Sequence, residues 1–314
     1  MEAQNLRLGF LGFGEAGYHF GRGLSQAGLR EIVAYTPSGA TAAADDPVRR
    51  RAAEAGVRLV ASPRELCECA ELIVAVTPGR AALPALRSVR PYLRARHIYV
   101  DASTAAVKAM EQAGRMLAGK AGFVDAAIMG TVPLNGIKVL TVASGPHAGR
   151  FRALMEPYGM NIQVVGEKPG AASAMKLIRS VCMKGIAAVL LETLEAAQRH
   201  DLLEAVAADI AASIDERPFA QIIKRFVCGT AVHAERRVHE MDESLELLRS
   251  LGASTRMTRA TRGRIRDIAR MGLRERFGGR EPDAIAQVLE AIVGADDMQQ
   301  PGGTASAQSR GTHG

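Results

Sequence analysis

The pattern of hydrophobic and polar positions changes at about residue 167. In the first part, apolar runs of four to seven residues alternate with amphipathic stretches, as strands alternate with helices. The runs that predict strands are 6–11, 31–35, 57–60, 71–76, 97–101, 122–126, 138–144 and 161–165. Strands and helices that alternate at this spacing are joined by right-handed crossovers, so we expect a parallel sheet.

The pattern of the second part is helical throughout. The predicted helices are 170–200, 202–214, 217–226, 230–251, 254–274 and 282–294. The sequence therefore predicts an α/β chain in which a parallel-sheet domain, residues 1–167, is followed by an all-helical domain, residues 168–296. The tail 297–314 is rich in Gly, Ser, Thr and Gln, and we expect it to be disordered.

A glycine-rich turn follows the first predicted strand and leads into an amphipathic helix. The turn reads Gly12-Phe13-Gly14-Glu15-Ala16-Gly17. Gly12 permits the turn, Gly14 lets the backbone approach a pyrophosphate, and Gly17 lets the helix pack closely on the strand. The helix N-terminus adds N–H groups and a positive dipole end. We therefore predict a Rossmann-type dinucleotide-binding domain and assign all six turn residues to the cofactor.

The end of the second strand indicates which nicotinamide cofactor is bound. An NAD site places Asp or Glu about 20 residues past the glycines, where it holds the ribose 2′-hydroxyl. Thr36 and Ser38 stand there with no carboxylate, and small hydroxyls tolerate a 2′-phosphate. The arginines that could pair with that phosphate, at 49–51, follow a full loop later. We predict NADP in preference to NAD, with Thr36 and Ser38 as contacts.

Further ligand contacts are expected where later strands end, because open α/β sheets bind ligands at the carboxyl ends of their strands. Thr77 and Pro78 follow the fourth strand, and we assign them to the cofactor. Ser103 and Thr104 follow the fifth, and we assign Ser103 to both cofactor and substrate. Helix capping by Asp101, Ser103 or Thr104 is an alternative that is compatible with ligand binding.

Four segments, in chain order, resemble the β-hydroxyacid dehydrogenase family, which includes 3-hydroxyisobutyrate, tartronate semialdehyde and phosphogluconate dehydrogenases. They are GFLGFGEAG at 9–17, VDAS at 100–103, FVDAAIMGTVP at 123–133 and GAASAMKLIRS at 170–180. The resemblance covers nearly the whole chain. It implies oxidoreductase activity on small hydroxy acids, an N-terminal Rossmann domain and a helical C-terminal domain that forms a homodimer.

The third segment departs from the family pattern D-A-P-V-S-G-G, which binds substrate. Met129 stands where the family has serine and Thr131 replaces one of two glycines, next to Gly130. The resemblance places substrate at these three residues, in a pocket that is less polar at one wall. One branch of the family shares AAIMG and an R-R-x-x-E-M helix, present here at 236–241. Many members of that branch have no assigned substrate.

The fourth segment implies that Lys176 is the catalytic lysine of the family, with Ser180 in place of the usual asparagine. Lys176 and Ser180 are four residues apart, on one face of a helix. A neutral Lys176 would take the proton from a substrate hydroxyl, and its ammonium form would protonate the alkoxide in reduction. The structural alternative is snorkelling or an ion pair with Glu192 or Glu195. We assign Lys176 and Ser180 to catalysis and regard Lys184 as structural.

A second helical face carries His233, Arg236, Arg237 and Glu240 at positions i, i+3, i+4 and i+7. A guanidinium from Arg236 or Arg237 suits a substrate carboxylate. The same pattern is equally typical of an ion-pair ladder on the surface. The two interpretations stay open, and both arginines are kept as candidate substrate contacts.

Composition narrows the choice of function. With 47% hydrophobic and 23% charged residues the chain is globular in type. No apolar run reaches the roughly 20 residues of a membrane span, and no secretory signal is visible, so we expect a cytoplasmic protein. The four cysteines fit neither a disulfide framework nor a metal site. Ten arginines and two acids lie in 249–280, yet nucleic-acid motifs are missing, so we expect a small-molecule substrate, not nucleic acid.

Together these features predict an NADP-preferring oxidoreductase that transfers hydride between the nicotinamide and a small β-hydroxy acid or related alcohol. One alternative is imine reduction on the same scaffold, although a charged Lys176 would repel an iminium. A second is an NADP-binding regulatory protein without turnover, which Met129 and Ser180 keep open because the family has other residues there. An anionic or nucleic-acid partner for the arginine-rich segment is a third.

Overall fold

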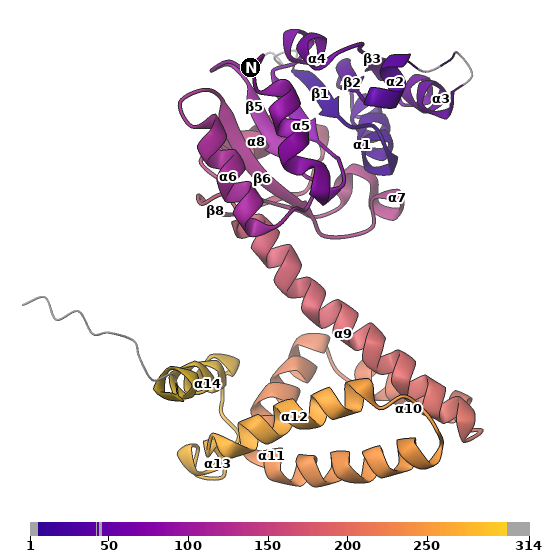
Figure 1. Cartoon of the computed structure of the whole chain (residues 1–314), viewed down its shortest axis with the longest axis vertical. Coiled ribbons are helices and arrows are strands. Elements are labelled where there is room, and N and C mark those ends of the chain that lie inside the picture. The colour runs from indigo at the N-terminus through magenta and orange to yellow at the C-terminus, as the bar shows by residue number, and fades with distance from the viewer. Residues whose placement is uncertain (1–5, 42, 44–45, 300–314) are drawn as a thin grey trace, which may run out of the picture. The chain divides into compact units, whose positions relative to one another are not determined.

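The computed structural model describes residues 6–41, 43 and 46–299 (Figure 1). The chain divides into two compact units, and the division falls inside one long helix, after Cys182. Each unit is described by itself. Among the described residues, no helix is long and apolar enough to cross a membrane.

The first unit is built on one sheet of eight strands in the order β3-β2-β1-β4-β5-β6-β7-β8. The strands are β1 (Arg7–Leu11), β2 (Glu31–Tyr35), β3 (Arg58–Leu59), β4 (Leu72–Ala75), β5 (Ile98–Asp101), β6 (Gly122–Ile128), β7 (Thr141–Ser144) and β8 (Ile162–Gly166). Six of the seven neighbouring pairs are parallel, which confirms the predicted fold class, and β6 and β7 are antiparallel. The predicted run 138–144 begins as a strand only at Thr141 because Gly136–Lys138 form a short 3₁₀ turn.

Helices cover both faces of this sheet (Figure 1). They are α1 (Glu15–Gln26), α2 (Pro37–Thr41), α3 (Pro47–Glu54), α4 (Pro63–Cys69), α5 (Ala82–Val89), α6 (Val107–Leu117), α7 (Val132–Asn135) and α8 (Ala148–Met155). Alternate strand residues enter opposite cores, as the period of two in a strand requires. In β4, Leu72 and Val74 join the core under α1, α3 and α8, whereas Ile73 and Ala75 join the one under α4, α5 and α6.

The second unit is helical, as predicted. Its elements are the C-terminal half of α9 (Ala171–Arg199), then α10 (Leu203–Asp215), α11 (Phe219–Ser250), α12 (Arg256–Arg270), α13 (Leu273–Arg276) and α14 (Ile285–Gln299). The two helices predicted at 217–226 and 230–251 are one helix, α11, with non-helical backbone angles at His233. The helix predicted at 254–274 divides at Gly272, which has φ of 62°. Helix α14 extends into the predicted tail 297–314, whose residues 300–314 lie outside the described part.

One buried carboxylate joins α9 to α12. Glu192 is 5% exposed and accepts hydrogen bonds from four donors. The donors are Ser254 Oγ at 2.8 Å, Met257 N at 3.0 Å, Thr258 N at 2.8 Å and Thr258 Oγ1 at 2.7 Å. Burial acts to raise the pKa of Glu192, but these hydrogen bonds outweigh it and lower the pKa to about 2. The side chain thus caps the N-terminus of α12.

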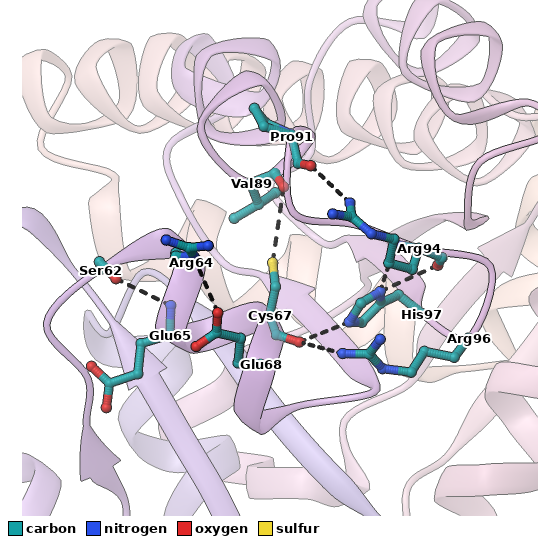
Figure 2. A network of polar contacts seen from close by, with 10 residues as sticks. All are labelled: Ser62, Arg64, Glu65, Cys67, Glu68, Val89, Pro91, Arg94, Arg96 and His97. Carbon is teal, nitrogen blue, oxygen red and sulfur yellow. Dashed lines mark hydrogen bonds and ion pairs between the residues drawn. The ribbon is translucent and has the colours of Figure 1, made fainter.

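A second polar network joins α4 to the start of β5 (Figure 2). His97 is fully buried; its Nδ1 accepts from Arg94 N at 2.8 Å, and its Nε2 lies 2.8 Å from the carbonyl oxygen of Cys67. This arrangement requires a neutral ring that carries its proton on Nε2. Burial also raises the pKa of the Cys67 thiol to about 12. Such a thiol is inert at neutral pH.

Candidate cofactor and active site

The glycine turn has the geometry that a dinucleotide requires. Gly12 has φ of 94°, a conformation that favours glycine, and its N–H donates to Tyr35 O at 2.8 Å. A Cβ on Gly14 would meet nothing within 4 Å, so the space beside this residue is open. A Cβ on Gly17 would lie 3.2 Å from Gly12 O and from the Phe13 ring. The turn is therefore tightly packed at its base and open where a pyrophosphate would approach α1.

The other residues of the turn differ in what they offer a ligand. The Phe13 side chain is 4% exposed and packs in the core, with its ring centroid 6.3 Å from that of Phe10. As a cofactor contact, Phe13 thus has only its backbone. Glu15 is exposed in the first turn of α1, and Ala16 is half-buried.

The end of β2 presents two hydroxyls. Thr36 Oγ1 and Ser38 Oγ are hydrogen-bonded to each other at 3.0 Å, and neither is buried. The carboxylate of Asp46 accepts from Val48 N at 2.8 Å and caps α3. This acid is thus already engaged at a helix end. The arginines at 49–51 follow it on α3.

Thr77 lies against the glycine turn. Its methyl carbon would be 3.1 Å from a Cβ on Gly12. Its hydroxyl oxygen is buried and has no hydrogen-bond partner among the described residues. Buried hydroxyls are normally paired, so this one is available to a ligand. Pro78, the next residue, is exposed.

Asp101 ends β5 and supports Ser103. The carboxylate is fully buried and accepts from Ser103 N at 3.0 Å and from the Ser103 hydroxyl through the same oxygen. Burial raises the pKa of Asp101, the Ser103 hydrogen bonds oppose this, and Asp125 adds to the rise. Since the Ser103 hydroxyl gives its proton to Asp101, it can accept a hydrogen bond from a ligand. The sequence indicated Asp101 only as a helix cap.

Lys176 meets Thr104 in the first unit. Its Nζ donates to Thr104 Oγ1 at 2.7 Å, and Thr104 has φ of 56°, which non-glycine residues rarely adopt. Gly79, which follows β4, packs closely against the backbone of Thr104, since a Cβ on Gly79 would lie 2.7 Å from Thr104 O. Ser180 is half-buried one turn further along α9, and Lys184 is exposed. The sequence indicated Thr104 only by its place after a strand and as a possible helix cap.

The predicted substrate residues after β6 separate into two kinds. Met129 is 9% exposed and packs in a small core with Ala127, Val142 and Ala172, so it can offer a substrate only its backbone. Gly130 and Thr131 are exposed. Their role as substrate contacts stays a prediction.

The arginines of α11 have partners within the second unit. Arg236 Nη1 lies 2.5 Å from Glu240 Oε1, and Arg237 donates to Thr230 Oγ1. His233 Nε2 is 3.8 Å from Glu281 Oε1. In the single chain Arg236 thus forms an ion pair, as one of the two interpretations expects. Substrate binding by Arg236 or Arg237 stays a prediction. Within the described residues, no three His, Cys, Asp or Glu side chains are grouped to hold a metal.

Sequence families match both parts of the chain. The family described as the NAD binding domain of 6-phosphogluconate dehydrogenase matches residues 7–166, and a domain of unknown function, DUF1932, matches residues 197–268. A curated relative, an uncharacterised 28.5 kDa protein of Methanothermus fervidus, is 25% identical over 263 residues. The match covers 84% of this chain and 99% of the relative.

Solved structures give a similar picture. A conserved hypothetical protein from Sinorhizobium meliloti is 30% identical with a TM-score of 0.58, over 83% of this chain and 88% of its own. A conserved protein of unknown function, described as structurally similar to 3-hydroxyacid dehydrogenases, is 29% identical with a TM-score of 0.56, over 92% and 99%. The NADP⁺ complex of an imine reductase from Myxococcus stipitatus is 19% identical with a TM-score of 0.73, over 91% and 99%, and shows the fold alone.

Proposed function

The chain belongs to the family that shares the NAD binding domain of 6-phosphogluconate dehydrogenase, and from this premise we propose that it is an NADP-preferring oxidoreductase acting on a small β-hydroxy acid or related alcohol. Its fold is an NAD(P)-binding dehydrogenase fold related to those of 3-hydroxyacid dehydrogenases and imine reductases. The single observation that carries the proposal is the Lys176–Thr104 hydrogen bond, which places an amine beside the carboxyl end of β5.

The glycine turn fits the cofactor. The open space at Gly14 admits a pyrophosphate, and the Thr77 hydroxyl has no partner among the described residues. The backbone N–H groups at the start of α1 would hold the pyrophosphate, while Thr36 and Ser38 would accommodate a 2′-phosphate without a repelling carboxylate. When bound, the nicotinamide ring supplies the chemistry of accepting or donating hydride.

Lys176 acts as the general acid/base in this proposal. In oxidation its neutral amine takes the proton of the substrate hydroxyl, and in reduction its ammonium returns a proton to the nascent alkoxide. The hydroxyl of Thr104 accepts from Nζ and fixes its direction. Ser103, Gly130, Thr131 and Ser180, all in the first unit, are the proposed contacts that orient the substrate. Arg236 and Arg237 stay candidate contacts of a substrate carboxylate on the chemistry of the guanidinium group alone.

Imine reduction is the second candidate. It is favoured by Met129, a buried apolar side chain that stands where the family has a serine in the substrate segment. It is opposed by Lys176, whose ammonium would repel an iminium. Binding of NADPH without turnover would instead favour a regulatory protein. The cytoplasmic location that the sequence predicts stays a prediction.

We also propose that two chains associate through α9. Large apolar side chains on this helix are exposed in the single chain, among them Ile178 at 71%, Val181 at 75% and Leu191 at 74%. Contiguous exposed apolar side chains of this size are normally covered by a partner surface. A second copy meets this requirement with the same apolar residues.

Side-by-side titration with NADPH and NADH, followed by cofactor fluorescence, tests the cofactor assignment; the chain has no tryptophan to interfere. We expect tighter binding of NADPH.

In turnover with a panel of β-hydroxy acids and imines, Lys176→Ala should bind NADPH normally but lose at least about 100-fold in kcat, the usual scale for a general acid/base. Lys184→Ala, on an exposed site of the same helix, is the control and should behave as the wild type. Full turnover by Lys176→Ala would refute the proposed mechanism.

A further inference from the structure

Asp125 occupies an unusual position for a residue in the middle of a buried strand. Its side chain is fully buried in β6, yet it accepts four hydrogen bonds. Oδ2 accepts from Ser144 Oγ at 3.1 Å, Gly170 N at 2.9 Å and Ser173 N at 3.0 Å, and Oδ1 accepts from Ser173 Oγ at 2.6 Å. Three of these four donors belong to the start of α9.

Asp125 is also the middle member of a row across the sheet. It is in register with Asp101 on β5 and with Ser144 on β7. Residues in register on neighbouring strands point to the same face. Ser144 extends the contact with α9, because its Oγ accepts from Ala172 N at 3.0 Å.

This row satisfies the free N–H groups of α9. The first N–H groups of any helix have no partner inside the helix, and a carboxylate beside them is stabilised by the helix dipole. Here Asp125 and Ser144 supply acceptors from the sheet for the N–H groups of Ala172 and Ser173. Gly170 has φ of 101° and packs where a Cβ would lie 2.9 Å from Val107, so the approach to the helix is fixed as well.

Lys176 lies one helical turn after Ser173, which is hydrogen-bonded to Asp125. It follows Ser173 by three residues, and so stands one turn along the helix on a neighbouring position. Its partner Thr104 follows Asp101, the in-register neighbour of Asp125, by three residues. Lys176 thus follows a residue that is bound to Asp125, and Thr104 follows a member of the same row of polar residues, each by three positions.

We propose that Asp125 is a positioning residue: it fixes the first turn of α9 so that Nζ of Lys176 meets Thr104 at the site of proton transfer. The inference rests on the proposed function, in which Lys176 exchanges that proton. Ser173 and Ser144 are the intermediaries, and Asp125 itself stays buried away from the reacting atoms.

The NMR signal of Lys176 distinguishes a positioning role of Asp125 from a merely structural one, because only the former displaces Nζ. The chain has seven lysines, so ¹³C-lysine labelling gives a simple NMR spectrum in which Lys176→Arg identifies the Lys176 signal. The test variants are Asp125→Asn, which removes the charge and weakens its hydrogen bonds, and Ser173→Ala, which removes one hydroxyl. Ser173→Ala keeps the test valid if Asp125→Asn does not fold.

Glu192→Gln is the matched control. Glu192 is likewise a buried carboxylate with four hydrogen bonds at a helix N-terminus, and it lies on the same helix. Both carboxylate variants should lower thermal stability. Only Asp125→Asn and Ser173→Ala should move the Lys176 signal toward those of the other lysines, because only they release the first turn of α9.

Turnover supplies the second readout. A displacement of about 1 Å costs roughly 100-fold in rate, so kcat should fall 10- to 100-fold in Asp125→Asn with little change in KM for NADPH. A Lys176 signal that stays in place in both test variants, or that moves as far in Glu192→Gln, would overturn the inference. If the signal moves as expected but no substrate is turned over by the wild type, the positioning role stands and the proposed dehydrogenase activity fails.

Discussion

At the scale of single residues, a substitution of Gly14 should affect cofactor binding without affecting folding. A Cβ there would meet no protein atom within 4 Å, but it would enter the space that a pyrophosphate needs. Gly14→Ala should therefore change the free energy of unfolding by less than about 0.5 kcal/mol, while the affinity for NADPH falls at least tenfold. Denaturant unfolding and fluorescence titration measure the two effects.

Gly149→Ala provides the comparison for Gly14→Ala. A Cβ on Gly149 also meets nothing within 4 Å, and the residue lies in α8, outside the predicted cofactor contacts. This variant should keep both its stability and its NADPH affinity. Unchanged NADPH binding by Gly14→Ala would mean that the glycine turn does not hold the pyrophosphate.

The residues that sequence could identify are those whose chemistry has a local signature. Gly12, Gly14 and Gly17 stand directly between a strand and a helix, so their spacing is informative by itself. Asp125 has no such signature: it lies within an apolar run, and its donors Gly170 and Ser173 follow 45 and 48 residues later. Thr104 was noticed only for its place after a strand, because neither its positive φ nor its contact with Lys176 leaves a local pattern.

At the scale of elements, the predicted boundaries and strand directions differ from the structure where they depend on contacts that leave no local pattern in the sequence. Periodicity predicted strands on both sides of residues 127–137, but the direction of the second strand depends on the connection between them. Helix α7 and the following 3₁₀ turn pack on α1 and do not cross the sheet, so β7 returns antiparallel to β6. The helices predicted at 217–226 and 230–251 left residues 227–229 between them, yet α11 continues through these residues, and Cys228 and Gly229 are buried.

The network that joins α4 to β5 predicts a pH-dependent stability (Figure 2). Burial lowers the pKa of His97 below its ordinary value of 6.5, and the neighbouring charges of Arg96 and Arg94 act in the same direction. As pH falls below about 6.5, the unfolded chain takes up a proton at His97 before the folded chain does. This histidine therefore costs the protein stability below that pH and none above it.

Urea unfolding of the wild type and of His97→Gln at pH 5.5 and 7.5 tests this expectation. The wild type should lose more stability between the two pH values than the variant, because glutamine does not titrate. His239→Gln, at an exposed position of α11, serves as the control and should keep the wild-type pH dependence. An equal pH dependence in the wild type and His97→Gln would show that His97 is not the group that titrates.

At the scale of the whole molecule, the two-part organisation was predictable because each part has its own hydrophobic period. How α9 is covered was not, because its apolar residues specify a buried helix without naming what buries it. The exposed fractions of Ile178, Val181 and Leu191 show that the described residues of one chain leave these apolar side chains of α9 uncovered.

The double variant Val181→Lys/Leu191→Lys tests association of two chains directly. Lysine is a good helix former, so α9 should persist while two charges replace apolar side chains that are 75% and 74% exposed. In light scattering after size exclusion, we expect the wild type to be a dimer and the double variant a monomer with a lower melting temperature. Leu134→Lys, which changes an 83% exposed residue on α7, should leave the dimer intact. A wild type that is monomeric at micromolar concentration would mean that something other than a second copy covers α9.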